Sequence, residues 1–204
     1  FCKSSLTDAR RAIGKGKSAL KTALTKADRG FLEARRAVTK LAPRRGPAPT
    51  EPPMEDLTRQ TSLLDTEPAE AAFPLPEPLL AQDGTVFLQE LPKELLRLLF
   101  SLQAPLQDWL EANQEADAHA QLLELYFAVQ DIARAAERYD AHFVTQLTAR
   151  GSELEWELLC LDPAPFVDAS LAAGRAAALF SATLTPPGYY RSVLGCSDAR
   201  AVAL

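Results

Sequence analysis

A proline-rich, acidic stretch over residues 43–78 divides the chain and most constrains what it can fold into. Nine of the fifteen prolines in the 204-residue sequence fall there, among acidic and small residues. Such a segment buries too little apolar surface to offset the entropy that ordering it would cost. We therefore predict a linker or a long surface excursion at 43–78, with at most a short helix near residues 54–64.

The segment before this linker has an apolar residue at every seventh position, which is coiled-coil spacing. The repeat runs through Leu6, Ile13, Leu20, Ala27, Ala34 and Leu41, and a neighbouring line holds Leu24, Phe31 and Val38. Gly14 and Gly16 interrupt the repeat, because each glycine inside a helix costs about 1 kcal/mol relative to alanine. We predict a basic helical arm over residues 1–42, with a short helix, a break near 14–16, and a longer helix to about Leu41.

Charge is distributed unevenly between the arm and the rest of the chain. Residues 1–46 carry 13 Lys or Arg against 3 Asp or Glu, whereas residues 47–204 carry 9 against 24. A basic arm joined to an acidic body indicates an internal electrostatic contact or an element that faces nucleic acid. The residues of the arm that could neutralise phosphates, each adding salt-dependent affinity, are Lys15, Lys17, Lys21 and Lys26. A solvated helix face is the alternative for these lysines.

Beyond the linker, the hydrophobic period predicts helices followed by a hairpin. Apolar residues at helical spacing predict helices at 92–109 and 117–139, within a helical insertion over residues 79–141 that begins with a short strand at 84–88. Pro105 should kink or divide the first of these helices. From residue 142 the period changes to two around a glycine turn, which predicts a β-hairpin over residues 142–161.

Residues 162–204 have the pattern of one edge of an α/β domain. A short helix at 165–173 precedes Ala176–Ser181, an apolar run of six residues that fits a buried strand of a parallel sheet. The small residues Ser181, Ala182 and Thr183 would then lie at the carboxyl rim of that sheet, where open α/β folds bind ligands. A further helix at 189–194 follows the Pro-Pro-Gly break.

Several function classes lack the residues that they require. The chain has no Gly-x-x-x-x-Gly-Lys-Ser/Thr phosphate loop, so we expect it to bind no nucleotide by itself. The three cysteines are too few for an iron–sulfur cluster and too far apart for a zinc site, and they fit a reducing, cytoplasmic compartment. His119 and His142 have no paired ligand or nucleophile, so we assign no catalytic or metal residue. No membrane span or signal peptide is apparent.

The run ALFSATLTPPGYYRSVLG, residues 178–195, resembles motif III of superfamily 2 helicases in the form seen in the DinG/XPD branch. The shared order is an apolar strand, Ser-Ala-Thr-Leu, a Thr-Pro step, an aromatic pair and Leu-Gly. Upstream, the hairpin sequence and the following LLCLDPAP also look like that branch. The resemblance covers residues 120–195 well and residues 1–110 only in general character. It departs from the branch at Pro187–Gly188 and in the proline-rich segment.

The resemblance implies an internal piece of an ATP-dependent DNA helicase that acts in DNA repair. The implied fold class is α+β and mainly α: an arch-like helical insertion with a β-hairpin, then part of an α/β RecA-like motor domain. Ser181, Ala182 and Thr183 would form the coupling motif, which links ATP hydrolysis to movement of the DNA strand. A first residue that is not Met and an apolar end at 201–204 fit such an internal piece.

The same resemblance assigns cofactors and partners to the parent protein. ATP and Mg²⁺ would bind to residues outside this chain, which would hold no cofactor and be inactive alone, and an iron–sulfur cluster would also have to lie elsewhere. The partners would be single-stranded or forked DNA and the remaining helicase domains, with no membrane.

Two other interpretations stay open. The arm could dimerise as a coiled coil in a non-enzymatic interaction module, although such a module would not need the hairpin. Alternatively, the chain could belong to a helicase-like nuclease, which would require a cluster of carboxylates in a cleft.

Overall fold

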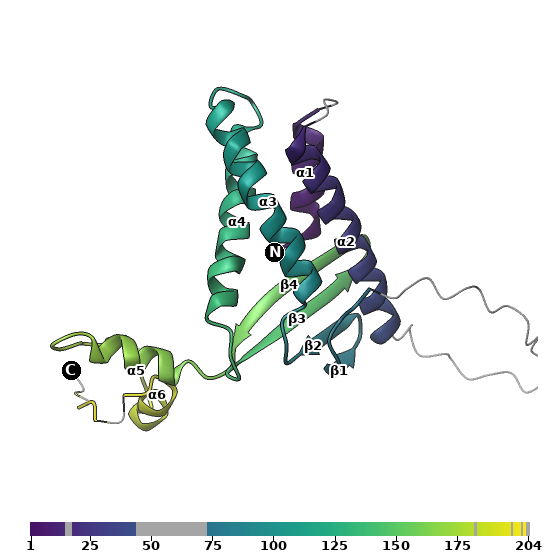
Figure 1. The fold of residues 1–204 in the computed structure, drawn as a ribbon. Helices are drawn as coiled ribbons and strands as arrows, with labels where there is room; N and C mark the ends of the chain where they lie inside the picture. The colour runs from purple at the N-terminus through teal and green to yellow at the C-terminus, as the bar shows by residue number, and fades with distance from the viewer. Residues whose placement is uncertain (15–17, 44–72, 182, 197, 201, 203–204) are drawn as a thin grey trace, which may run out of the picture.

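The computed structural model describes residues 1–14, 18–43, 73–181, 183–196, 198–200 and 202. Four helices stand on one face of a four-stranded antiparallel sheet, and two shorter helices lie to one side as an appendage (Figure 1). The fold is therefore α+β and mainly helical, as the sequence predicts. The predicted linker lies mostly outside the described residues, and the short helix expected near 54–64 lies wholly outside them.

The basic arm folds as a helical hairpin. Its helices are α1 (Lys3–Ala12) and α2 (Ala19–Leu41), and Gly14 in the break between them has a φ of 76°. Ser18 begins α2 as its N-cap, because its hydroxyl accepts a hydrogen bond from the Lys21 backbone N–H at 3.1 Å. The predicted short helix, break and long helix ending at Leu41 are confirmed.

Asp28 of α2 holds α1 in place. Its carboxylate lies 3.2 Å from Lys3 Nζ and 3.2 Å from Arg10 Nη1, and it accepts a hydrogen bond from Thr7 Oγ1 at 3.0 Å. The side chains of Asp28 and Lys3 are only 13% and 12% exposed, so water screens this pair less than a surface pair. Two cations of the arm thereby share one carboxylate within the arm itself.

Most of the apolar heptad line of the arm is buried inside the chain, whereas Ile13 is half-buried and Leu41 is exposed. α2 packs against α3 (Lys93–Ala112) and α1 packs against α4 (His119–Glu137), so the four helices close into a bundle. The arm contributes to this core Leu6, Leu20, Leu24, Ala27, Phe31, Ala34 and Val38. A dimerising coiled coil would need these residues to be free, so the structure argues against that alternative.

The sheet is a meander of four strands in chain order. They are β1 (Pro78–Gln82), β2 (Thr85–Leu88), β3 (Phe143–Arg150) and β4 (Glu153–Cys160). β3 and β4 form the predicted hairpin, and Gly151 turns it with a φ of 57°. Leu147 pairs with Val86 on one side and Trp156 on the other, and this row is fully buried beneath the helices. How these elements divide into domains stays a prediction.

Pro105 was predicted to kink or divide its helix, and the division is not observed. α3 continues through Pro105 as one helix. Pro105 removes one backbone hydrogen bond, but the helix turns on either side bury Leu102 and Leu106 completely in the core. Packing therefore keeps the helix continuous.

The buried strand predicted at 176–181 is not formed either. After α5 (Ala164–Ala172) the chain is irregular and exposed over these residues until α6 (Pro187–Val193), and Phe180 is 92% exposed. A strand of a parallel sheet needs neighbours that complete its hydrogen bonds, and the only sheet in the described part of the chain is the β1–β4 meander. The assignment of residues 162–204 to a motor domain therefore stays a prediction.

Candidate functional site

The predicted coupling motif lies in the exposed loop between α5 and α6. Ser181 Oγ and Thr183 Oγ1 are 3.0 Å apart, and the Thr183 backbone N–H donates to Ser181 Oγ at 3.3 Å. The structure thus brings the two predicted hydroxyls together on the surface, while Ala182 lies outside the described residues. This pair can donate to or accept from a partner that approaches the loop.

Large apolar side chains close to this hydroxyl pair in the sequence are exposed. Leu179 is 51% exposed, Phe180 is 92% exposed, and Tyr189 at the start of α6 is 59% exposed. The Tyr189 and Tyr190 rings contact each other edge to face, with centroids 5.2 Å apart. Large exposed apolar patches mark sites of interaction, so these side chains are candidates for contact with a partner.

Gly195, the last residue of the motif-like run, fixes how α6 meets α5. It follows the C-cap of α6 with a left-handed φ of 67°, and the next backbone N–H, that of Cys196, donates back to the Arg191 carbonyl at 2.9 Å. A Cβ at this position would lie 2.5 Å from the Ala164 carbonyl oxygen of α5. Only glycine meets both requirements, the left-handed turn and the close approach.

Gly195→Ala is therefore expected to separate α5 from α6 without unfolding the bundle. A left-handed conformation costs a non-glycine residue roughly 1–2 kcal/mol, and the clash with the Ala164 backbone adds to that cost. Hydrogen exchange should become faster in both appendage helices and stay unchanged in β3 and β4. Gly188→Ala is the matched control, because a Cβ there meets no atom within 4 Å. Equal exchange in the two variants would contradict this account of Gly195.

A cluster of aromatic and charged residues joins the appendage to the body. The Phe166 ring of α5 packs against Phe143 and His142, with centroids 5.4 and 5.8 Å apart. His142 Nδ1 lies 3.1 Å from Asp140 Oδ1, and its Nε2 lies 4.0 Å from Asp162 Oδ2. The sequence placed His142 at the strand start, but it gave no signal for the contact with α5, because Phe166 lies far along the chain.

The backbone N–H of His142 also donates to Asp140 Oδ1 at 2.9 Å. This bond stabilises the carboxylate form and so lowers the pKa of Asp140. Asp140 therefore stays ionised at neutral pH.

The lysines predicted to meet phosphates have different surroundings. Lys15 and Lys17 lie outside the described residues. Lys21 Nζ donates to the Gly14 carbonyl and helps to close the break between α1 and α2. Lys26 is exposed on α2, and no described residue pairs with it.

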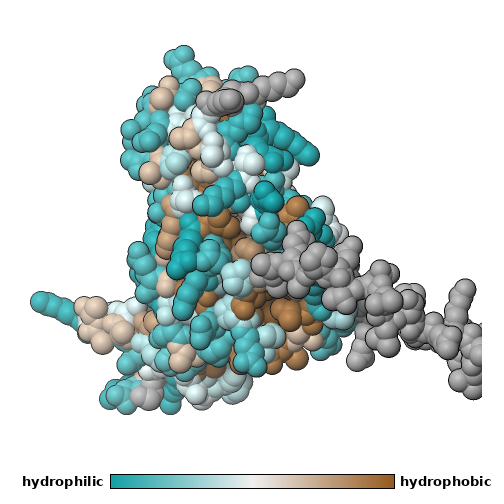
Figure 2. Space-filling model, turned by 45° about the vertical axis from the view of Figure 1, so that its right-hand side comes forward, coloured by the Kyte–Doolittle hydropathy of each residue, from teal (hydrophilic) through white to brown (hydrophobic). Residues whose placement is uncertain are grey.

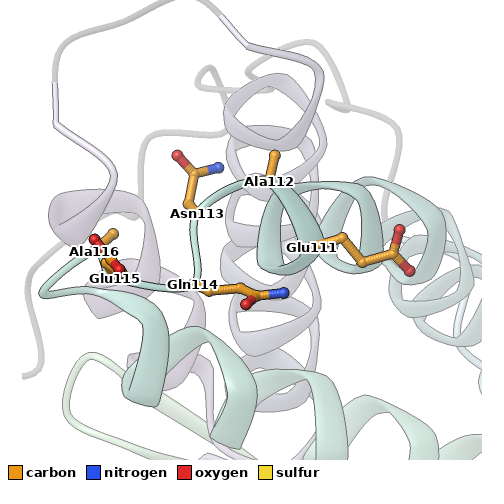
Figure 3. Close-up of a pocket in the computed structure, with 6 residues that line it drawn as sticks. All are labelled: Glu111, Ala112, Asn113, Gln114, Glu115 and Ala116. Carbon is orange, nitrogen blue, oxygen red and sulfur yellow. The ribbon is translucent and has the colours of Figure 1, made fainter.

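The hollow at the turn between α3 and α4 has no arrangement suited to chemistry. Its lining residues are Glu111, Ala112, Asn113, Gln114, Glu115 and Ala116. Their side chains splay apart, and Glu111 points away from Glu115 (Figure 3). Among the described residues, no group of three or more His, Cys, Asp or Glu side chains could hold a metal ion. No described helix is long and apolar enough to cross a membrane.

No protein family model matches this chain, and neither the curated proteins nor the solved structures include a significant match to it.

Proposed function

We propose that this chain is the arch-like insertion and the motif III region of a DinG/XPD-like, ATP-dependent DNA helicase. In this proposal the helical bundle and its sheet help to enclose single-stranded or forked DNA. Ser181, Ala182 and Thr183 transmit ATP hydrolysis to strand movement. ATP and Mg²⁺ bind to motor residues that lie outside this chain, and the remaining helicase domains are its partners.

The observation that carries the proposal is that residues 1–2 pair with β4, close to where the hairpin ends. The Phe1 nitrogen donates to the Trp156 carbonyl at 2.7 Å, and the Trp156 N–H donates to the Phe1 carbonyl at 2.8 Å. Cys2 pairs in the same antiparallel way with Glu155. β4 ends only four residues later at Cys160, which is about 14 Å along a strand. A domain inserted into another needs its two ends close together.

The uncovered apolar run before Ser181 also supports the proposal. Burying a side chain such as Leu179 or Phe180 is worth about 1.5–3 kcal/mol, so a chain that leaves both in water gains stability when a partner covers them. In the proposal, strands of the motor domain outside this chain pair with residues 176–181. Ser181 and Thr183 then stand at the rim of the completed sheet, which is where ligands bind in such folds.

The nuclease alternative gains no support from the described residues. A nuclease would need carboxylates that converge to hold metal ions, and no such group of side chains is found in the described part of the chain.

The proposal is tested by comparing ATP hydrolysis by this chain and by the protein made from its complete reading frame. The 204-residue chain is expected to show no ATPase activity with single-stranded DNA, because it lacks a phosphate loop. The complete protein is expected to hydrolyse ATP and to be stimulated by single-stranded DNA. Turnover by the chain alone, or a complete protein without DNA-stimulated turnover, would overturn the proposal.

A further inference from the structure

Four basic residues of α2 lie on the side of the helix that faces away from the core. We call Lys26, Arg29, Arg36 and Lys40 the basic stripe, and all four are exposed. At about 100° per residue they fall within a sector of roughly 80°, opposite the buried residues of the same helix. Lys26 and Lys40 are fourteen residues apart, so the stripe is about 21 Å long.

Most of the charge in the basic stripe is not neutralised by the described residues. Arg29 Nε lies 3.3 Å from Glu33 Oε1, and both side chains are well exposed, so this pair is weak. For Lys26, Arg36 and Lys40, the described part of the chain supplies no hydrogen bond or ion pair. Other described cations of the arm are engaged, as Lys3 and Arg10 pair with Asp28, while Arg35 donates to the Gly151 carbonyl at 2.6 Å.

Within the described part of the chain, no acidic residue outside the arm pairs with the basic stripe. Every ion pair that the arm makes among the described residues is with a carboxylate of the arm itself. The acidic residues of the bundle are concentrated on α3, α4 and the turn between them, where residues 93–137 carry eight Asp or Glu against three Lys or Arg. In the bundle, the pair α1 and α2 is therefore basic and the pair α3 and α4 is acidic. The predicted electrostatic contact between the basic arm and the acidic body is not formed among the described residues.

We infer that the basic stripe binds the phosphate backbone of a single strand of nucleic acid, and the choice of DNA as that strand rests on the proposed function. A row of separated point charges about 21 Å long matches a linear polyanion, and at 3.4 Å per nucleotide it spans about six nucleotides. A protein partner would need apolar or aromatic anchors at the centre of the contact, and the basic stripe contains none.

The surface view is consistent with this choice of partner. With the side that carries α1 and α2 turned forward, hydrophilic residues cover most of the helical end of the body, while apolar residues gather lower down, nearer the sheet (Figure 2). The structure therefore shifts the expected phosphate contacts along the arm. Lys26 remains among the residues expected to contact phosphates, and Lys21 does not, because it bonds to Gly14. Arg29, Arg36 and Lys40 join that set.

The test is binding of a fluorescein-labelled 20-nucleotide oligothymidine to the intact 204-residue chain, measured by anisotropy across a range of salt concentrations. The stripe variant combines Lys26→Gln, Arg36→Gln and Lys40→Gln. The matched control combines Lys93→Gln, Arg97→Gln and Arg134→Gln, which removes three exposed cations from the opposite helix pair. All six side chains are exposed, so circular dichroism should show the wild-type fold in both variants.

The stripe variant is expected to bind about 100-fold more weakly at 0.1 M salt, because each phosphate contact contributes about 0.7 to the salt slope on a single strand. The slope of its log affinity against log salt concentration should become shallower by about 2. The control variant should retain wild-type affinity. Three results would overturn the inference: no binding by the wild-type chain, equal losses in the two variants, or equally tight binding of polyglutamate. The ATPase test of the proposed function does not involve these residues, so either idea can fail alone.

Discussion

Replacement of Trp156 by alanine is expected to lower the free energy of unfolding by about 3–5 kcal/mol, the range for removing a large aromatic side chain from a core. Trp156 is fully buried at the middle of β4, in the row that also contains Val86 and Leu147. Its ring packs against Phe31 of α2, with centroids 6.4 Å apart. The side chain therefore joins the sheet to the arm, and its loss leaves a cavity between them.

The hydrogen bonds of Trp156 add nothing to this cost. Its indole Nε1 is buried and bonds to no described residue, so the substitution breaks no side-chain bond there, and the backbone bonds to Phe1 do not depend on the side chain. The loss should appear in urea denaturation followed by circular dichroism, as a lower midpoint with an unchanged slope. Phe180→Ala is the control, because this ring is 92% exposed and its removal should change stability by less than about 0.5 kcal/mol. A loss below about 1 kcal/mol for Trp156→Ala would contradict the core assignment.

The elements that the sequence predicted well are those whose signal is local. The arm helices and the β3–β4 hairpin follow from the period of their own apolar residues, and Gly14 and Gly151 mark the turns between them. β1 was not predicted, because it is an edge strand whose residues are mostly exposed and which begins at a proline. Its pairing with β2 is set by the sheet and not by its own pattern.

The two predicted features that are not observed both depended on contacts remote in sequence. Pro105 is tolerated because the core holds the helix on both sides of it, which no local rule can report. The apolar composition of residues 176–181 was interpreted as burial. Burial also requires neighbouring strands, and none of the described strands lies beside this run. The apolar composition of residues 176–181 therefore indicated an apolar segment, but not whether a neighbouring strand covers it.

The candidate sites were predictable to different extents. Sequence proximity alone brings the Ser181 and Thr183 hydroxyls together, and the structure places them 3.0 Å apart. The charge count identified the arm as basic but could not tell which cations are free. That depends on where Asp28 and Gly14 lie in space, and on which side of α2 is buried.

Thr183→Ala tests the central claim in the protein made from the complete reading frame. Threonine and alanine are both small, so the substitution removes the hydroxyl with little change in shape. If Thr183 transmits hydrolysis to strand movement, the variant should retain ATP hydrolysis and lose unwinding. The expected loss in unwinding rate is about fivefold, since one hydrogen bond is worth about 1 kcal/mol and tenfold in rate corresponds to about 1.4 kcal/mol. Ser192→Ala on α6 is the control, as this exposed hydroxyl lies outside the Ser-Ala-Thr motif.

The decisive measurement is therefore DNA-stimulated ATP hydrolysis and unwinding of a forked DNA by the wild-type protein and these two variants, side by side. The helicase proposal predicts hydrolysis by all three proteins and an unwinding defect confined to Thr183→Ala. Absence of DNA-stimulated hydrolysis in the wild-type protein would contradict it, as would unwinding by Thr183→Ala at the rate of Ser192→Ala.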